Sequence, residues 1–312
     1  MIRIGVDFGG TKIEAAALAP GGGFLARVRV PNPGNYDDAL ATVRDLVERV
    51  EAEAGAPGNA NCTVGVGLPG SISPRTGLMR NANSTYLNGR TFREDLSAAM
   101  GREIRVANDA NCLALSEAVD GAVQGAKVAF GIIVGTGCGG GLVVDGQLVE
   151  GANGIGGEWG HMPLPWPSEA ESPGPTCWCG LQGCLETWVS GTGFQRDYAE
   201  AEGGRALTGP AIIEAARRGE PAAMAAFDRL IGRLGRAIAV VCNLLDPDAF
   251  VIGGGLSNVT ELFERLPGAV RPFVFSDAWE AKIVPALWGD SSGVRGAARL
   301  WSSEDQLVVP SA

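Results

Sequence analysis

The sequence has 312 residues, of which 47 are glycine and one is histidine, with 46% apolar and 19% charged side chains. Its length indicates about two domains, and this composition excludes a collagen-like or disordered chain. The net charge of −10 argues against a nucleic-acid-binding surface, which needs a basic stripe. An acidic residue at position 7 argues against a signal peptide, and no apolar run reaches membrane-spanning length. We therefore expect a cytoplasmic protein without membrane or nucleic-acid partners.

The first part of the chain reads as short strands joined by glycine turns. β-Branched and alternating patterns predict strands over 2–6, 13–18, 24–30, 62–67 and 104–107. Apolar residues at helical spacing predict a helix over 36–54. A second helix, 110–119, is expected to follow Asn108 and Asp109, a pair typical of helix N-caps.

The same strand–turn–strand order recurs further along the chain. A strand over 128–134, a glycine turn over 135–141 and a returning strand over 142–144 suggest a loose internal duplication, although such hairpins are common. Residues 151–191 are dense in Gly, Pro, Trp and Cys and predict a long structured loop region. The remaining predicted elements are a helical region over 210–245, a strand over 249–252, a helix ending at 266 and a last helix over 291–301.

Four glycine turns follow predicted strands. They are Gly9-Gly10-Thr11, the segment from Gly135 through Thr136, Gly137 and Gly139 to 141, Gly253-Gly254-Gly255, and a weaker one over 65–70. Such turns expose several backbone N–H groups in one direction and form anion-binding nests. One alone is a weak signal, and none matches the P-loop pattern. Two on similar hairpins, each with a threonine, predict a clamp that holds one polyphosphate from two sides.

Two acidic positions stand where strands end. A carboxylate at Asp7, beside the first glycine turn, suits a Mg²⁺ ion held through water, although Asp7 could merely cap the turn. A carboxylate at Asp109 can accept a proton from a hydroxyl during phosphoryl transfer. The alternative for Asn108 and Asp109 is plain N-capping.

The cysteines cluster in the loop region. Cys177, Cys179 and Cys184 lie within eight residues, and His161 lies sixteen residues upstream. Three cysteines and one histidine are a tetrahedral zinc ligand set, so we predict a zinc site, with free thiols or a redox pair and a buried histidine as alternatives. A disulfide framework is not expected. The other cysteines, Cys62, Cys112, Cys138 and Cys242, read as core residues.

Two glutamates flank these presumed ligands. Glu158 precedes His161 by three positions, and Glu186 follows Cys184 by two. If zinc fixes the loop, both carboxylates are held near one place, where they can accept hydrogen bonds from sugar hydroxyls. Taken alone, each would more often be a surface residue.

Four segments together resemble one family. Asp7-Phe-Gly-Gly-Thr11, the Gly135 loop, Gly157-Glu-Trp-Gly-His161 and Cys177-Trp-Cys-Gly-Leu-Gln-Gly-Cys184-Leu-Glu186 resemble the ROK sugar kinases (repressors, open reading frames and kinases) over residues 1–301. The resemblance implies an α/β protein with the actin-like ATPase (ribonuclease H-like) fold, two α/β domains flanking a cleft. The N-terminal domain would hold residues 1–108, joined by the C-terminal helix 291–302. The larger domain, 109–290, would carry the zinc loop 151–191.

Within the family, the chain is most similar to bacterial fructokinases that also accept mannose. The stretches that carry this similarity are 67–74, 81–85, 87–89, 107–114, 116–121, 163–166 and 289–297. Met162 departs from the asparagine expected after the histidine in that subgroup, which puts the fine sugar preference in question.

The resemblance also implies roles for single residues. Asp109 is expected to be the catalytic base. The expected sugar contacts are Asn83, Asn108, Asp109, Glu158, His161 and Glu186, with His161 bound to zinc through its other ring nitrogen. The expected ATP·Mg²⁺ contacts are Asp7, Gly9, Gly10, Thr11, Lys12, Gly135, Thr136, Gly137 and Gly139, with Gly253, Gly254 and Gly255 on the adenosine side. The zinc ligands would be His161, Cys177, Cys179 and Cys184, and homodimers are usual in the family.

The sequence thus predicts a zinc-containing, ATP-dependent kinase for the 6-hydroxyl of D-fructose, with mannose also accepted. A kinase of the same family for glucose, mannose or N-acetylglucosamine is the first alternative. A sugar-responsive regulator is the second, disfavoured because the Asp7 motif begins too early for a preceding helix-turn-helix. A catalytically dead sugar-binding protein is disfavoured because Asp109 and both phosphate turns are intact.

Overall fold

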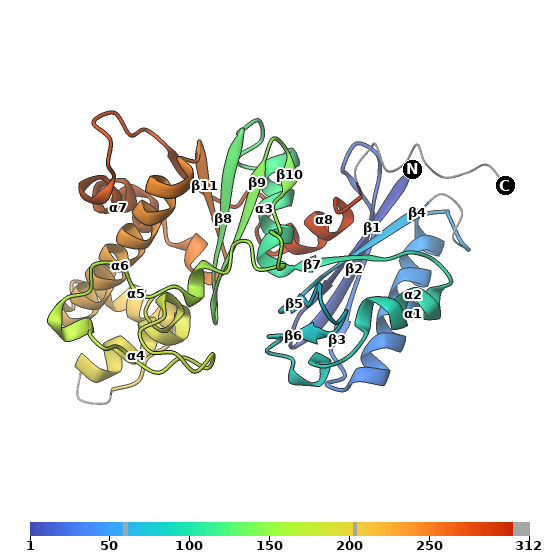
Figure 1. Cartoon of the computed structure of the whole chain (residues 1–312), viewed down its shortest axis with the longest axis horizontal. Helices are drawn as coiled ribbons and strands as arrows, with labels where there is room; N and C mark the ends of the chain where they lie inside the picture. Colours follow the sequence, from blue (N-terminus) through green and yellow to red (C-terminus); the bar gives the residue numbers. More distant parts are fainter. Residues whose placement is uncertain (59–61, 202–204, 302–312) are drawn as a thin grey trace.

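The structure is a computed structural model that describes residues 1–58, 62–201 and 205–301. Two five-stranded sheets lie side by side, with helices α3 (Asp109–Asp120) and α8 (Ser292–Ala298) between them (Figure 1). None of the described helices is both long and apolar enough to span a membrane.

The first sheet has the strand order β3-β2-β1-β4-β7. β1 pairs antiparallel with β2 and parallel with β4, and β4 pairs parallel with β7. The strands are β1 (Ile2–Phe8), β2 (Lys12–Leu18), β3 (Phe24–Pro31), β4 (Cys62–Leu68) and β7 (Arg105–Asn108). The carboxyl ends of the three parallel strands therefore meet at one edge, where Asp7, Leu68 and Asn108 lie.

Helices α1 (Tyr36–Glu53) and α2 (Phe92–Met100) pack with the first sheet around one apolar core. The Asn35 side chain caps α1 by accepting from the Asp38 N–H. Phe92 of α2 packs edge-to-face on Phe8 at 5.6 Å between ring centroids. A short hairpin, β5 (Ser71–Ile72) and β6 (Met79–Arg80), extends from the carboxyl end of β4.

The second sheet has the order β10-β9-β8-β11-β12. β8 pairs antiparallel with β9 and parallel with β11, as β1 does with β2 and β4, so the expected repeat is present in the topology. The strands are β8 (Val128–Val134), β9 (Cys138–Val144), β10 (Gln147–Leu148), β11 (Ala249–Gly253) and β12 (Lys282–Pro285).

Side chains of the second sheet alternate between two cores, because successive residues of a strand face opposite sides. Phe130 and Ile132 belong to the large core that includes α4 (Gly191–Ala201), α5 (Gly209–Arg217), α6 (Pro221–Leu245) and α7 (Thr260–Val270). Ala129 belongs to a smaller core with Leu113 and Ala114 of α3.

A buried carboxylate fixes the segment that leads into α8. Glu117 of α3 is fully buried and accepts hydrogen bonds from the backbone N–H groups of Leu287 and Trp288 and from the Ser292 hydroxyl. These bonds satisfy the buried charge, which would otherwise be costly, and hold α8 against α3.

The structure corrects several predicted boundaries. The glycine turn expected over 135–141 is a turn only to Gly137, because β9 begins at Cys138 and pairs with β8. The helical region 210–245 is two helices, since Gly219 at positive φ ends the first and Pro221 begins the second. The last helix spans only 292–298, and residue 302 of its predicted range lies outside the described residues. The division into domains at 108/109 falls where β7 meets α3 and stays a prediction.

Candidate active site

A cavity of about 500 Å³ lies between the carboxyl edge of the first sheet and the β8–β9 turn. All six predicted sugar contacts line it, namely Asn83, Asn108, Asp109, Glu158, His161 and Glu186. Thr136, Gly137 and Gly139 of the predicted phosphate turn line it as well. A larger cavity of about 1270 Å³ beside Arg3 and Trp301 contains none of these residues. The predicted residues therefore select the smaller cavity as the candidate site.

Asp109 is the first residue of α3, and its side chain reaches solvent through this cavity. Its Oδ1 accepts a hydrogen bond from the Ala110 N–H at 2.8 Å. Desolvation by the surrounding protein raises the pKa of Asp109 to about 6. The hydrogen bond from Ala110 acts in the opposite direction and lowers this pKa, whereas the negative charge of Glu158 raises it further. A carboxylate with a pKa near 6 is ionised at neutral pH and is a better proton acceptor than an ordinary aspartate.

Asn108 does cap the helix, as the alternative interpretation held. Its Oδ1 accepts from the Ala110 N–H at 2.9 Å, and its Nδ2 donates to the Gly70 carbonyl at 3.2 Å. An amide has two donor hydrogens and two lone pairs, so each end of Asn108 can form one further bond. Capping and sugar binding are therefore compatible at this residue.

Asp7 lies in β1, which β4 separates from β7 in the sheet. Asp7 does not line the 500 Å³ cavity. Burial, followed by the charge of Asp109, raises the pKa of Asp7 to about 6. The β1–β2 turn behind it is tight, because the Gly9 N–H bonds to the Lys12 carbonyl at 3.0 Å. Thr11 at its tip is exposed, and neither Gly10 nor Lys12 lines the cavity.

The two other segments predicted to contact ATP, the turn at Gly135 and the segment 253–255, lie next to each other in the second sheet. The Gly135 N–H bonds to the Gly137 carbonyl at 3.0 Å and closes the β8–β9 turn. Gly254 has a φ of +83°, and a Cβ there would lie 2.5 Å from the Val134 carbonyl oxygen, so only glycine fits. Gly253 is the last residue of β11, and Gly254 and Gly255 follow it beside the turn that begins at Gly135.

The segment bearing Glu158 and His161 packs tightly on β9. The Trp159 indole donates to the Gly139 carbonyl at 3.0 Å, and its ring packs edge-to-face on Phe130 at 5.5 Å. A Cβ on Gly160 would lie 2.0 Å from the Cys138 carbonyl oxygen, so this approach also requires glycine. The packing of Trp159 and Gly160 thus places the two flanking polar side chains in the cavity wall.

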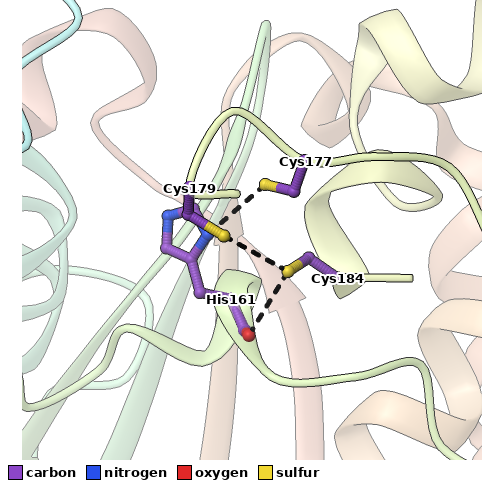
Figure 2. Close-up of side chains that lie close together, drawn as sticks. All are labelled: His161, Cys177, Cys179 and Cys184. Carbon is purple, nitrogen blue, oxygen red and sulfur yellow. Dashed lines mark hydrogen bonds between the residues drawn. The ribbon is translucent and has the colours of Figure 1, made fainter. Parts of the chain in front are cut away.

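The four predicted zinc ligands form one cluster (Figure 2). Their donor atoms all lie within 4.8 Å of one another. The Cys177 Sγ lies 3.6 Å from the His161 Nδ1, and the Cys179 Sγ lies 3.6 Å from the Cys184 Sγ. Tetrahedral zinc with Zn–S near 2.3 Å and Zn–N near 2.0–2.1 Å requires ligand atoms roughly 3.5–3.8 Å apart. The cluster fits zinc, and no two cysteines of the described residues form a disulfide.

Glu186 links the zinc loop to the phosphate turn. Its Oε2 accepts from the Cys138 N–H at 2.9 Å, and its Oε1 accepts from the indole of Trp178 at 2.7 Å. Trp178 also lines the cavity, and so does Thr192 at the start of α4. Neither residue was among the predicted contacts. For Trp178 a signal was present, because it stands between two presumed zinc ligands.

Comparison with known proteins identifies the family. The model of the ROK family matches residues 3–304. This chain belongs to the ROK family. An N-acetyl-D-glucosamine kinase of Pectobacterium atrosepticum is 41% identical over 303 residues, which are 95% of this chain and 97% of the relative.

Solved structures of ROK proteins share this fold. The ROK hexokinase of Thermus thermophilus has 33% identity and a TM-score of 0.84, covering 96% of this chain and 97% of that one. The ROK glucokinase of Streptomyces griseus, solved with glucose and AMPPNP, has 29% identity and a TM-score of 0.76, covering 96% and 99%. The predicted actin-like α/β fold is thereby confirmed.

Proposed function

We propose that this ROK protein is an ATP-dependent kinase that phosphorylates the 6-hydroxyl of a hexose. The observation that carries the proposal is the placement of Asp109, a carboxylate with a raised pKa, in a cavity with five other polar residues suited to sugar hydroxyls. Thr136 and Gly137 of the β8–β9 turn and Gly139 of β9 border the same cavity, so an acceptor hydroxyl and a phosphate group can meet there.

The proposed step is a direct phosphoryl transfer. The sugar O6 attacks the γ-phosphorus of ATP, its proton passes to the Asp109 carboxylate, and the bond from phosphorus to the ADP oxygen breaks. The products are a hexose 6-phosphate and ADP. The N–H groups of Gly9 and Gly135 close the two turns, and the remaining backbone N–H groups of the turns, those of Gly10, Thr11, Thr136 and Gly137, bind phosphate oxygens. Asp7 is suited to hold Mg²⁺ through water, and the ion would neutralise phosphate charge during transfer.

In the same proposal, zinc has a structural role. His161, Cys177, Cys179 and Cys184 would hold it and so join the segment around His161 to the segment 177–184. His161 uses Nδ1 on the cluster side, which leaves Nε2 for the sugar. The loop carries Glu158 before the cluster and Glu186 after it, so the ion fixes the distance between these sugar contacts.

For the acceptor sugar, the relatives and the sequence motifs favour different candidates. The 41% identical N-acetyl-D-glucosamine kinase supports N-acetyl-D-glucosamine, and we put this sugar first. D-Fructose, the sugar predicted from the sequence, stays the second candidate because the stretches 81–85 and 163–166 resemble those of fructokinases. Asn83 and Asn81, both in the first stretch, line the cavity.

A sugar panel tests the proposal. ADP release would be followed with ATP and, in turn, N-acetyl-D-glucosamine, D-fructose, D-mannose, D-glucose and N-acetyl-D-mannosamine, and the product would be mapped by ³¹P and ¹³C NMR. We expect one sugar to have the highest kcat/KM and to carry its phosphate on O6. ADP release no faster with any sugar than without one, combined with sugar binding, would favour the regulator alternative instead.

A further inference from the structure

Trp178 is an exposed tryptophan that lines the candidate sugar cavity. The side chain lies between the zinc ligands Cys177 and Cys179, and 64% of its surface is exposed. It lines the 500 Å³ cavity together with Asp109, His161 and Glu186. An exposed tryptophan in a polar cavity is a candidate ligand contact, because its ring is apolar and its N–H can make a hydrogen bond.

The indole contacts two of the three predicted sugar residues in the zinc loop, His161 and Glu186. Its ring packs edge-to-face against the imidazole of His161, with centroids 5.0 Å apart and planes at 84°. Its Nε1–H donates to the Oε1 of Glu186 at 2.7 Å. One side chain therefore touches two of the six predicted sugar contacts, while its own position is set by the cysteines on either side.

The bond to Glu186 completes the orientation of that carboxylate. The other oxygen, Oε2, is held by the Cys138 N–H at the start of β9. With both oxygens engaged by different segments, the carboxylate plane cannot rotate without losing a hydrogen bond. Each oxygen keeps a lone pair, so Glu186 can still accept from a sugar hydroxyl, in a direction set by Trp178 and Cys138.

We propose that Trp178 binds the sugar and positions Glu186: its ring forms an apolar wall against which the sugar lies, and its N–H orients the carboxylate. The inference rests on the proposed hexose kinase activity. Because the ring limits the space beside His161 and Glu186, Trp178 also contributes to the choice among hexoses that differ in the substituent facing this wall.

Three variants test the two parts of the proposal. Trp178→Phe keeps a ring and removes the N–H, and Trp178→Ala removes both. Trp166→Phe is the matched control, since Trp166 lies in the same loop region and is 52% exposed, but stacks on Phe273 outside the cavity. For each protein, the sugar KM, the ATP KM, kcat and the zinc content would be measured with the preferred sugar.

We expect the sugar KM to rise about 3- to 10-fold in Trp178→Phe, the fold-change that corresponds to the net free energy of one ordinary hydrogen bond. It should rise by at least about 30-fold in Trp178→Ala, with the ATP KM and zinc content changed less than about twofold in both. The ratio of kcat/KM between N-acetyl-D-glucosamine and D-fructose should change at least about tenfold in Trp178→Ala. Trp166→Phe should match the wild type in all of these.

Tryptophan fluorescence gives a readout without catalysis. We expect the preferred sugar, added without ATP, to change the emission of the wild type and of Trp166→Phe, and to leave that of Trp178→Phe unchanged. An unchanged sugar KM in Trp178→Ala, or a full fluorescence response in Trp178→Phe, would overturn the inference while leaving the kinase proposal intact. A wild type that phosphorylates none of the sugars would instead overturn the kinase proposal.

Discussion

Asp7 near the end of β1 and Asp109, which directly follows β7, lie at the same edge of one sheet, and the charge of Asp109 helps to raise the pKa of Asp7. β4 separates β1 from β7, and these three strands are parallel, so both carboxylates lie at the carboxyl edge. Burial is the larger cause of each shift, and each pKa reaches about 6. Two neighbouring carboxylates of this kind suit a site where one holds a cation near phosphate and the other accepts a proton.

The raised pKa of Asp109 predicts an acid limb in the activity profile. The base must be ionised to accept the O6 proton, and its pKa lies above the ordinary value, so activity is lost as pH falls through about 6. We expect kcat/KM for the sugar to fall about tenfold per unit below pH 6 and to level off above pH 7. The Mg²⁺ that enters with ATP favours the ionised forms of Asp7 and Asp109. Since kcat reports the substrate-bound enzyme, its acid limb should lie at lower pH than that of kcat/KM, which reports the free enzyme. A kcat/KM independent of pH from 5 to 7 would contradict this assignment.

The cysteine cluster predicts one zinc ion per chain. Cys179→Ser removes one ligand, so we expect metal analysis to find less than about half an equivalent of zinc and the sugar KM to rise at least tenfold. Cys62→Ser is the control, because Cys62 begins β4 in the first sheet, far along the chain from the cluster. It should keep the zinc and the sugar KM of the wild type. Wild-type protein that contains no zinc would refute the site.

Two helical glycines should respond to alanine in opposite ways. A Cβ at Gly296 of α8 would lie 1.7 Å from the Cys112 carbonyl oxygen of α3, whereas a Cβ at Gly232 of α6 meets nothing within 4 Å. We expect Gly296→Ala to lower the free energy of unfolding by at least about 3 kcal/mol. Gly232→Ala should raise it by about 0.5–1 kcal/mol, the difference in helix propensity.

Chemical denaturation of the three proteins checks this pair. Equal stability of Gly296→Ala and the wild type would show that α8 does not pack on α3 as closely as described.

Local patterns predicted much of the fold, and tertiary contacts explain most of what they missed. Alternation and β-branching identified β1 and β8, and the strand-ending Asn108 marked the start of α3. Glycines at 139–141 suggested a turn but lie in β9, where a Cβ at Gly141 would come within 2.8 Å of the Ala110 carbonyl oxygen. Gly139 and Gly141 leave room for α3, and Gly140 leaves room for Trp159 on the other face of the sheet, which no local pattern reveals.

In the candidate site, too, some residues could be predicted from the sequence and others could not. The zinc ligands could be predicted because their residue types and spacing are set by the metal, and the structure brings them together. Trp178 could not be assigned a role, because its contacts with His161 and Glu186 depend on how the loop folds around the cluster. The acceptor sugar could not be predicted reliably, because it depends on the shape of the whole cavity.

The most direct test of the account compares Asp109→Asn with Asp145→Asn on the preferred hexose. Both changes remove one carboxylate charge, but Asp145 is exposed in the β9–β10 turn with a positive φ that asparagine tolerates. We predict that Asp109→Asn forms ADP and hexose 6-phosphate at least 100-fold more slowly than the wild type, with unchanged thermal stability, while Asp145→Asn keeps wild-type turnover. Near wild-type turnover in Asp109→Asn would contradict the central claim that this carboxylate is the catalytic base.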